Sequence, residues 1–291
     1  MFILVCQFLT MYIYILFICV YLYRFSFKFV KRRPYRFGNI VATMIAITLT
    51  ISGFHSHYNK KEVIYHVTVP KTSSVSQFSD LHLSSGTYMR QVRKLVKTVN
   101  NKHYDLVCFA GDVFDENTPD ALMNRSLQKF KNMKSTYGTY WISGNHEYYG
   151  KHTDFTVFEK YNIHFLKNTY ETVDNTFNIV GFTDKTSRDH YDINQVIKGM
   201  NTSLPTITLD HNPERFDQHT YFTDLQLSGH THNGQIFPGN IILHYYYQNS
   251  YGLSHYKNHY LLVSGGYGSW GFPFRLGTQC EYDTIYLTMR K

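Results

Sequence analysis

Hydrophobic positions divide the chain into two long apolar runs at its start and a remainder in which short apolar runs alternate with polar segments. Residues 1–23 carry no charged side chain, and a second uncharged run covers residues 37–54. Both runs approach the ~20 residues that an α-helix needs to cross a lipid bilayer. The intervening stretch from Arg24 to Arg36 is rich in Lys and Arg, so the pattern predicts a helical hairpin with a positively charged loop.

The charge of this loop predicts how the hairpin lies in the cell membrane. Cytoplasmic loops are enriched in Lys and Arg, so both outer ends of the hairpin, and the chain after residue 54, are expected to be extracytoplasmic. Tyr21 and Tyr23 end the first run, as is typical of a membrane interface. Two other interpretations stay open: residues 37–54 can form the core of a signal-type segment, or either run can be a buried soluble helix. We interpret residues 1–61 as a membrane anchor with its linker.

Beyond a polar linker at residues 55–61, the pattern is one of short strand-like runs and longer amphipathic stretches. Apolar residues recur at helical spacing between Met89 and Val99, and Pro119 begins a second helix. Strands are expected at residues 64–69, 75–78, 106–110, 139–142, 163–166, 177–180, 206–209, 225–227, 241–245, 260–263 and 284–287. This alternation predicts one α/β domain over residues 62–291, a four-layer αββα sandwich of two mixed β-sheets flanked by helices.

The net charge of +8 belongs to the N-terminal segment rather than to the domain. Residues 1–38 contain six Lys or Arg residues and no acid, so +2 remains over residues 39–291, and Lys60 and Lys61 account for it. Residues 62–291 are therefore close to neutral, without the basic stripe that a nucleic-acid partner requires, and we expect no such partner. The four Cys residues include no CxxC pair, which excludes a small domain stapled by disulfides.

Five short polar clusters stand where an apolar strand run gives way to a turn. They are Asp80-Leu-His82, Gly111-Asp112-Val-Phe-Asp115, Gly144-Asn145-His146-Glu147, His211 in LDHNP, and Gly229-His230-Thr-His232. Each cluster alone is an ordinary turn, but strand ends are where ligands converge in layered α/β folds. Acidic, amide and imidazole groups gathered there would repel or desolvate one another unless cations neutralised them.

The types of side chain indicate which cations these are. Imidazole, amide and carboxylate ligands without thiolate suit Mn²⁺, Fe or Zn²⁺. The candidate groups are too many for one tetrahedral ion, whereas two divalent ions roughly 3.5–4 Å apart would use them, an arrangement that serves phosphoester hydrolysis. The sequence therefore predicts two divalent metal ions as cofactors and a phosphoester as substrate.

The order of these clusters, D-x-H, G-D-x-x-D, G-N-H-E, H and G-H-x-H, resembles that of the calcineurin-like metallophosphoesterase superfamily. The surrounding segments YGTYWISGNHEYY, LDHNPERF and GHTHNGQIFP are similar to its membrane-associated branch, which includes bacterial phosphoesterases and a transmembrane protein with a metallophosphoesterase domain. The resemblance covers about residues 64–290. Two positions depart from that branch: Asn233 stands in place of a glycine, and residues 278–281 replace a proline-rich segment.

The resemblance implies a role for each cluster, with two sets of metal ligands that share one carboxylate. The implied ligands are Asp80, His82 and His232 for one ion, Asn145, His211 and His230 for the other, and Asp112 as the bridge. His146 is the implied general acid, and Asp115 is expected to accept a hydrogen bond from it and hold it oriented. Arg275 and Gln235 are expected to contact the substrate.

This set implies a metal-dependent phosphoesterase that hydrolyses phosphodiester or pyrophosphate bonds. A hydroxide bridging the two ions is expected to attack phosphorus while His146 protonates the leaving oxygen. Two alternatives stay open. One is a lipid pyrophosphatase of the UDP-2,3-diacylglucosamine type, because a membrane anchor favours a lipid-linked substrate, and the other is a non-catalytic metal-binding scaffold. A nuclease is disfavoured by the near-neutral domain.

Overall fold

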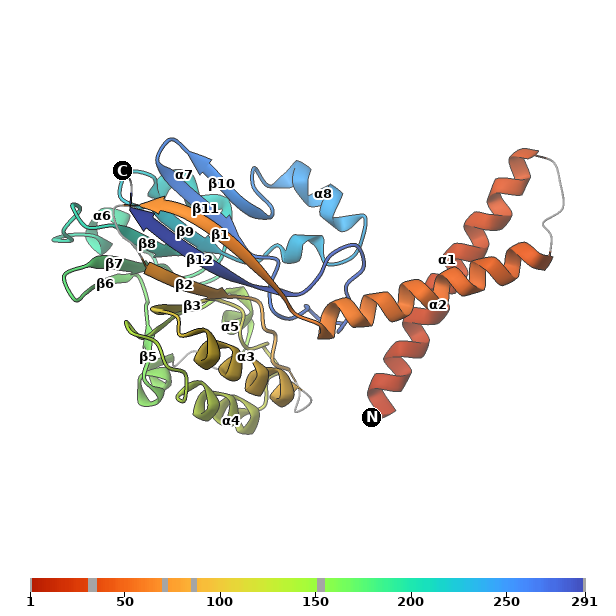
Figure 1. The fold of residues 1–291 in the computed structure, drawn as a ribbon, viewed down its shortest axis with the longest axis horizontal. Coiled ribbons are helices and arrows are strands. Elements are labelled where there is room, and N and C mark those ends of the chain that lie inside the picture. The colour runs from red at the N-terminus through yellow and green to blue at the C-terminus, as the bar shows by residue number, and fades with distance from the viewer. Residues whose placement is uncertain (1, 31–35, 70–72, 85–87, 151–154, 290–291) are drawn as a thin grey trace.

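Two six-stranded β-sheets lie face to face at the centre of the computed structural model, which describes residues 2–30, 36–69, 73–84, 88–150 and 155–289 (Figure 1). The first sheet has the order β1 (Lys61–Val69), β12 (Glu281–Met289), β2 (Ser73–Phe78), β3 (Leu106–Ala110), β4 (Thr139–Ile142), β5 (Ile163–Phe165). The second has the order β10 (Gly252–Tyr256), β11 (His259–Val263), β9 (Leu225–Ser228), β8 (Thr206–Leu209), β7 (Phe177–Gly181), β6 (Thr169–Val173). Both sheets combine parallel and antiparallel neighbours, as predicted.

The apolar faces of the two sheets bury one another. Val75 and Ile285 of the first sheet and Leu209 and Leu227 of the second belong to one core cluster and are fully buried. Strands that are covered on both faces appear in a sequence as short continuous apolar runs. Strand β3, with the sequence LVCFA, is such a run and was predicted at its observed bounds.

Helices cover the outer faces of the sandwich and complete the predicted four layers. They are α3 (Met89–Lys102), α4 (Asp120–Phe130), α5 (Asn145–Tyr149), α6 (Ile193–Val196), α7 (Phe216–His219) and α8 (Gly239–Tyr246), with 3₁₀ helices at Phe155–Tyr161, Pro213–Arg215 and His232–Gly234. Leu95 of α3 and Leu127 of α4 share a core cluster with Trp141 of the first sheet. Phe216 of α7 packs with Val263 of the second. The αββα sandwich is therefore confirmed.

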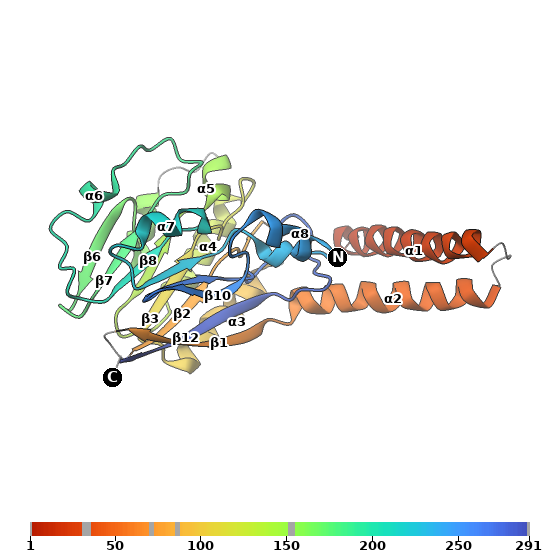
Figure 2. The ribbon, with the colours of Figure 1, turned by 90° about the horizontal axis from the view of Figure 1, so that it is seen from above.

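Two further helices, α1 (Phe2–Val30) and α2 (Arg36–Tyr58), form a hairpin that projects away from the sandwich (Figures 1 and 2). Within them, Leu9–Lys28 and Phe37–Tyr58 are each long and apolar enough to cross a membrane. Only 6% and 22% of these two segments are buried inside the structure. Neither segment is therefore a core helix of the sandwich, which removes the interpretation as buried soluble helices.

The hairpin differs from its prediction in the basic loop between the two apolar runs and in the linker that follows the second run. Helix α1 continues to Val30 and α2 begins at Arg36, so the predicted basic loop is helical at residues 24–30 and at Arg36, and its residues 31–35 lie outside the described residues. The predicted linker at residues 55–61 is helical as far as Tyr58. Tertiary contacts hold this last turn, because the buried His57 ring nitrogen Nδ1 lies 2.8 Å from a serine hydroxyl oxygen of the sandwich.

One predicted strand is wrong and two strands were missed. Residues 241–245 belong to α8, because Pro238 precedes the helix and its carbonyl accepts the first helical hydrogen bonds, and no strand among the described residues pairs with this segment. Strands β6 and β10 are the two edges of the second sheet. Edge strands are partly solvated and therefore carry a weaker apolar signal in the sequence.

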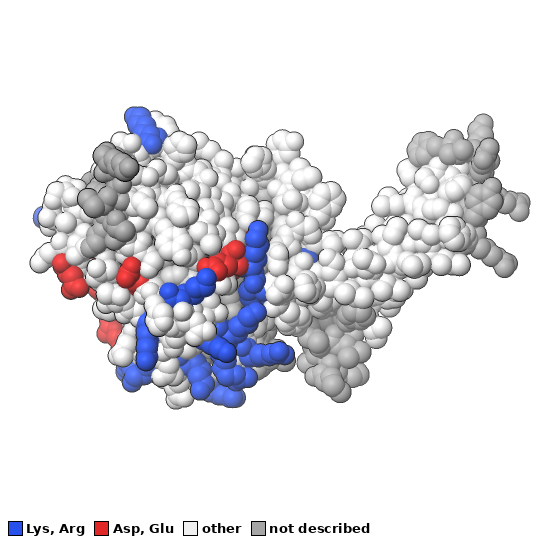
Figure 3. Space-filling model, viewed as in Figure 1, with Lys and Arg blue, Asp and Glu red and all other residues white. Residues whose placement is uncertain are grey.

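Lys and Arg side chains gather over α3 and α4 (Figure 3). Arg90, Arg93, Lys94 and Lys97 all lie on the exposed face of α3, which contains no acid. The near-neutral total of the domain hides this local concentration. The expectation of a domain without a basic stripe is therefore wrong at this face, and the absence of a nucleic-acid partner stays a prediction.

Candidate metal centre

The polar clusters of both sheets meet at the carboxyl ends of their strands. Asp80 follows β2, Asp112 follows β3, His211 follows β8, and His230 and His232 follow β9. Four of these five have positive φ, with 52° at Asp80 and Asp112, 74° at His230 and 51° at His232. Such conformations are unfavourable for residues with a Cβ and cluster at functional sites. The backbone is thus bent so that these side chains converge.

Glycines make room for two of the carboxylates. A Cβ on Gly144 would collide with Asp112 Oδ1, and a Cβ on Gly229 would collide with Asp80 Oδ2. Gly144 follows β4 and so lets a neighbouring strand end of the same sheet approach Asp112, whereas Gly229 follows β9 and lets the second sheet approach Asp80 of the first. Both carboxylates are almost completely buried.

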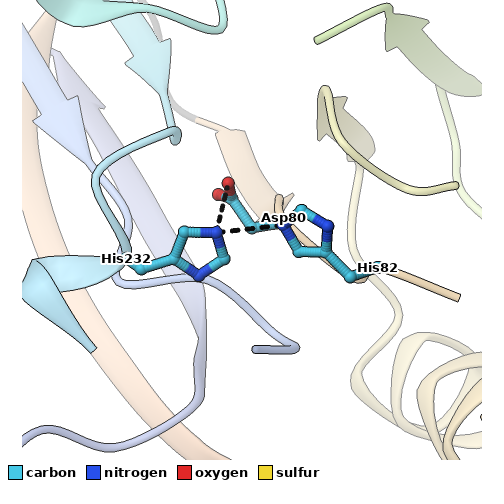
Figure 4. A group of neighbouring side chains, drawn as sticks. All are labelled: Asp80, His82 and His232. Carbon is cyan, nitrogen blue, oxygen red and sulfur yellow. Dashed lines mark hydrogen bonds and ion pairs between the residues drawn. The ribbon is translucent and has the colours of Figure 1, made fainter. Parts of the chain in front are cut away.

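The first group of side chains is Asp80, His82 and His232, whose ligand atoms all lie within 4.8 Å of one another (Figure 4). The Nε2 atoms of the two histidines are 3.0 Å apart, and His232 Nε2 is 3.4 Å from Asp80 Oδ1. Two imidazole nitrogens and a carboxylate oxygen that face one another are a donor set for Mn²⁺, Fe or Zn²⁺. The residues present therefore fit a divalent cation.

Asp112 lies between this group and the second. Its Oδ2 is 3.9 Å from His82 Nε2 and 3.1 Å from His211 Nε2. Burial alone would raise the pKa of Asp112, but the adjacent His211 and His82 hold that pKa well below its usual range. A buried carboxylate that reaches both groups is suited to bridge two cations.

His211 presents one nitrogen to the second group. Its Nδ1 lies 2.7 Å from the carbonyl oxygen of Ala110, which can only accept, so Nδ1 donates. Its Nε2 is fully buried and faces Asp112 Oδ2 at 3.1 Å, and no described residue donates a hydrogen bond to it. In the neutral tautomer that nitrogen carries a lone pair, and a buried lone pair without a donor fits a metal ion.

Asn145 and His230 complete the second group. Asn145 Oδ1 lies 2.9 Å from His230 Nδ1, and the rings of His211 and His230 have their centroids 5.2 Å apart. The backbone N–H of His230 donates to Asp80, with an N···O distance of 3.1 Å to Oδ1. The structure thus brings all seven predicted ligands together in two adjoining groups.

The predicted partner of His146 is corrected. Asp115 Oδ1 lies 2.5 Å from His82 Nδ1 but 3.5 Å from His146 Nδ1, whereas Glu116 Oε2 lies 2.8 Å from His146 Nδ1. Asp115 therefore holds a ligand of the first group, and Glu116 holds His146. The Thr118 hydroxyl accepts from the backbone N–H of Asp115 at 2.8 Å and fixes this turn, so adjacent carboxylates face different rings.

Glu147 accepts hydrogen bonds from the backbone, a role that the sequence alone did not predict. Its Oε2 accepts from the backbone N–H groups of Asp112 and Gly144 at 2.9 and 2.7 Å, and its Oε1 from those of Val113 and Phe114 at 2.7 and 3.0 Å. Burial and the nearby Asp112 raise the pKa of Glu147 to about 7, against the opposing effect of the hydrogen bonds from Phe114 and Gly144. The motif G-N-H-E contains this residue, so an acid directly after Asn145 and His146 was the available signal.

Arg275, the predicted substrate contact, is engaged by groups of the protein. It is fully buried, and its guanidinium donates to the carbonyls of His232 and Gly268 at 2.8 and 2.7 Å, while its Nη2 lies 3.0 Å from His232 Nδ1. Its backbone N–H donates to the carbonyl of Gly53 in α2 at 3.0 Å. Arg275 therefore supports His232 from behind rather than clamping a phosphate.

A cleft of about 530 Å³ opens over the two groups. His146, Gln235, Ile242 and Trp270 are among its lining residues. The Gln235 amide exchanges two hydrogen bonds with the backbone of Trp270, at 3.0 and 2.8 Å, so the predicted substrate contact is occupied by protein. Among the described residues that line the cleft none is Lys or Arg, so a phosphate there would rely on the metal centre for positive charge.

The residues of the two groups lie within the part of the chain that is similar to known proteins. The family model of the calcineurin-like phosphoesterases matches residues 74–234. An uncharacterized metallophosphoesterase of Helicobacter pylori (strain ATCC 700392 / 26695) is 30% identical over 97% of this chain and 80% of its own length. A transmembrane protein with metallophosphoesterase domain from Bos taurus is 26% identical over 88% of this chain, which spans 64% of that protein. A crystal structure of phosphopantetheinyl hydrolase from Mycobacterium tuberculosis is 13% identical over 72% of this chain and 96% of that one, with a TM-score of 0.43.

Proposed function

Because the chain belongs to the calcineurin-like phosphoesterase family, we propose that it is a membrane-attached hydrolase that cleaves phosphodiester or pyrophosphate bonds with two divalent metal ions. The observation that carries this proposal is the convergence of two ligand groups on one buried carboxylate, Asp112. A single structural ion would need only one of the groups. Two groups side by side beneath an open cleft suit a reaction on a bound phosphoryl group.

The ligand sets follow from the two groups. Asp80, His82 and His232 would hold one ion, and Asn145, His211 and His230 the other, with Asp112 shared. The chemistry that a pair of divalent cations supplies in such a site is activation of water as the nucleophile and neutralisation of charge on the phosphoryl oxygens. The protein's part is to fix the ligands, which the hydrogen bonds of Asp115 to His82 and of His211 to Ala110 support.

His146 is the residue that we propose as general acid. Its Nδ1 is engaged by Glu116, which leaves Nε2 to donate a proton to the leaving oxygen of a substrate in the cleft. The Glu116 carboxylate contacts Nδ1 and fixes the orientation of the ring. His146 is mostly buried but lines the cleft, so it combines a fixed position with access to substrate.

The hairpin supports membrane attachment. Helices α1 and α2 each contain a segment that is long and apolar enough to span a bilayer and is hardly covered by protein. With the basic residues between them in the cytoplasm, the catalytic domain faces the exterior of the cell membrane. A lipid pyrophosphatase is the second candidate function, and the apolar wall that α8 contributes to the cleft favours it.

The test uses the full chain in nanodiscs with Mn²⁺. We expect hydrolysis of bis(p-nitrophenyl) phosphate or of a pyrophosphate diester, and two Mn²⁺ ions per chain by elemental analysis. The Asp112→Asn variant is expected to lose its high affinity for both Mn²⁺ ions and its hydrolytic activity. A chain that binds Mn²⁺ but turns over neither substrate would be the metal-binding scaffold instead, and a chain that binds a single ion would contradict the two-metal site.

A further inference from the structure

Large apolar side chains stand exposed along one rim of the cleft. The rim consists of Phe237, α8 and Trp270. Phe237, Ile241, Tyr245 and Tyr246 are 56%, 49%, 87% and 79% exposed, and Trp270 is 58% exposed. Helix α8 has the sequence GNIILHYY and carries no Lys, Arg, Asp or Glu. A surface patch of this kind next to a site usually marks contact with an apolar partner.

The rim lies at the end of the domain from which the hairpin emerges. Both views of the ribbon place α8 on the side of the sandwich that faces α1 and α2 (Figures 1 and 2). Ile236, next to Phe237 in the chain, packs with Phe274 into a cluster that includes Ile15 and Ala46 of the hairpin. The apolar surface of the rim is therefore continuous with that of the two helices.

This continuity indicates that a lipid bilayer covers the rim. A bilayer that surrounds α1 and α2 would begin where the hairpin meets the domain, at the level of Phe54 and Phe274, whose rings have centroids 5.4 Å apart. Tyr and Trp are the residues enriched at the headgroup level of a membrane, and the rim presents Tyr245, Tyr246 and Trp270 there. Burial of such side chains in the headgroup region removes their apolar surface from water.

The same rim forms one wall of the cleft. Ile242 of α8 and Trp270 line the cleft together with His146 and His230. A molecule held in the membrane could thus extend along α8 while its phosphate reaches the metal ligands. A polar substrate in free solution would not need apolar contacts with this wall.

We propose that the rim lies in the headgroup region of the bilayer that the hairpin crosses, and that the cleft takes a lipid whose headgroup carries a phosphodiester or pyrophosphate. This inference rests on the proposed function, because it specifies the substrate class of that site. The chain would then act on lipids of its own membrane, and the headgroup of the lipid would enter the cleft.

A first experiment measures where Trp270 lies. The chain contains two Trp residues, and Trp141 is fully buried in the sandwich core. With the full chain in vesicles that contain brominated phosphatidylcholine, we expect quenching of part of the Trp fluorescence, and its loss in the Trp270→Phe variant. Trp141 serves as the internal control. Absence of quenching, with the hairpin inserted, would overturn the proposed position of the rim.

A second experiment compares two substrates with the same leaving group. One is bis(p-nitrophenyl) phosphate in solution, and the other is a p-nitrophenyl ester of phosphatidic acid in vesicles. The Ile241→Ser/Tyr245→Ser variant changes rim residues that do not line the cleft. We expect it to lose at least about tenfold in kcat/KM on the vesicle substrate and to stay within twofold of wild type on the soluble one.

The matched control is Ile64→Ser/Tyr221→Ser, because these side chains are 51% and 59% exposed but lie on β1 and after α7. Equal losses in both variants, or no loss in either, would overturn the inference while activity on the soluble substrate keeps the proposed function intact. Inactivity of the wild type on both substrates would instead contradict the proposed function. Rim-to-rim crosslinks between two chains in vesicles would mean that a second copy covers the rim, which also overturns the inference.

Discussion

Arg275 connects the carbonyl of Gly53 in the hairpin to His232 in the metal centre. The backbone N–H of Arg275 donates to Gly53, and its guanidinium donates to the His232 carbonyl. The Ser269 hydroxyl lies 3.3 Å from Arg275 Nε and 2.8 Å from His57 Nδ1, which adds a second route from α2. The hairpin is thus part of the support of the candidate metal centre.

Removal of this support is expected to weaken metal binding. In Arg275→Met, the His232 ring and carbonyl lose their donor, so we expect Mn²⁺ affinity to fall by about 10–100-fold, as for other partners of metal-ligating histidines. Calorimetric titration of the purified chain with Mn²⁺ measures this. Arg188→Met changes an exposed arginine and is the control. Wild-type Mn²⁺ affinity in a folded Arg275→Met variant would contradict the supporting role.

Asp115 and Glu116 are expected to affect different quantities. Asp115→Asn weakens the hydrogen bond that orients His82, so Mn²⁺ affinity should fall by about 10–100-fold. Glu116→Gln should leave affinity unchanged because its partner is His146. Metal titration of both variants checks the assignment. The reverse outcome would restore the partner of His146 that the sequence had suggested.

Loss of the proposed general acid is expected to slow turnover without loss of metal. His146→Gln should lower kcat by about 10²–10⁴-fold, the usual contribution of a positioned acid or base. Glu116→Gln should also lower kcat, but by a smaller factor than His146→Gln. Steady-state kinetics at saturating Mn²⁺, with metal content measured in parallel, tests this. Turnover at the wild-type rate in His146→Gln would remove the role.

Glu147 is expected to matter for stability. In Glu147→Gln, an amide –NH₂ replaces one oxygen and faces two backbone N–H groups, which lose their acceptor. An unsatisfied buried donor costs about 1–3 kcal/mol, so the free energy of unfolding should fall by about 2 to 6 kcal/mol. Denaturant unfolding followed by circular dichroism measures it. Glu159→Gln, at an exposed site, should change little.

His219 is expected to make the stability of the domain depend on pH. Burial lowers the pKa of His219 below 6.5, and its ring stacks on Phe182 with centroids 4.5 Å apart. Below pH 6.5 the unfolded chain binds a proton that the native chain does not, so the free energy of unfolding falls as pH falls, by up to about 1.4 kcal/mol per pH unit.

The measurement compares unfolding curves between pH 5 and 7.5 at saturating Mn²⁺. Relative to wild type, His219→Gln should show a smaller loss of stability at low pH, because it removes one proton-binding site of the unfolded chain. His190→Gln, at an exposed histidine, should keep the wild-type dependence. Parallel curves for wild type and His219→Gln would contradict the assignment.

Local patterns in the sequence predicted the fold class well. The apolar run at residues 106–110 matches its strand residue for residue, because a strand covered on both faces is typically apolar along its whole length. Residues 241–245 contain an apolar run of the same kind but form α8. Whether such a run pairs in a sheet depends on neighbours far away in the chain, which no local pattern contains.

By itself, the sequence determined the αββα fold class, the two apolar helices and the residue types of the metal centre. Each of these depends on patterns within short segments of the chain. Only the tertiary structure decided which carboxylate faces which ring at Asp115 and Glu116. It also decided that Arg275 lies buried against His232, 43 positions away. Hydrogen-bond partners and burial arise from packing between distant segments, so they become visible only when the chain is folded.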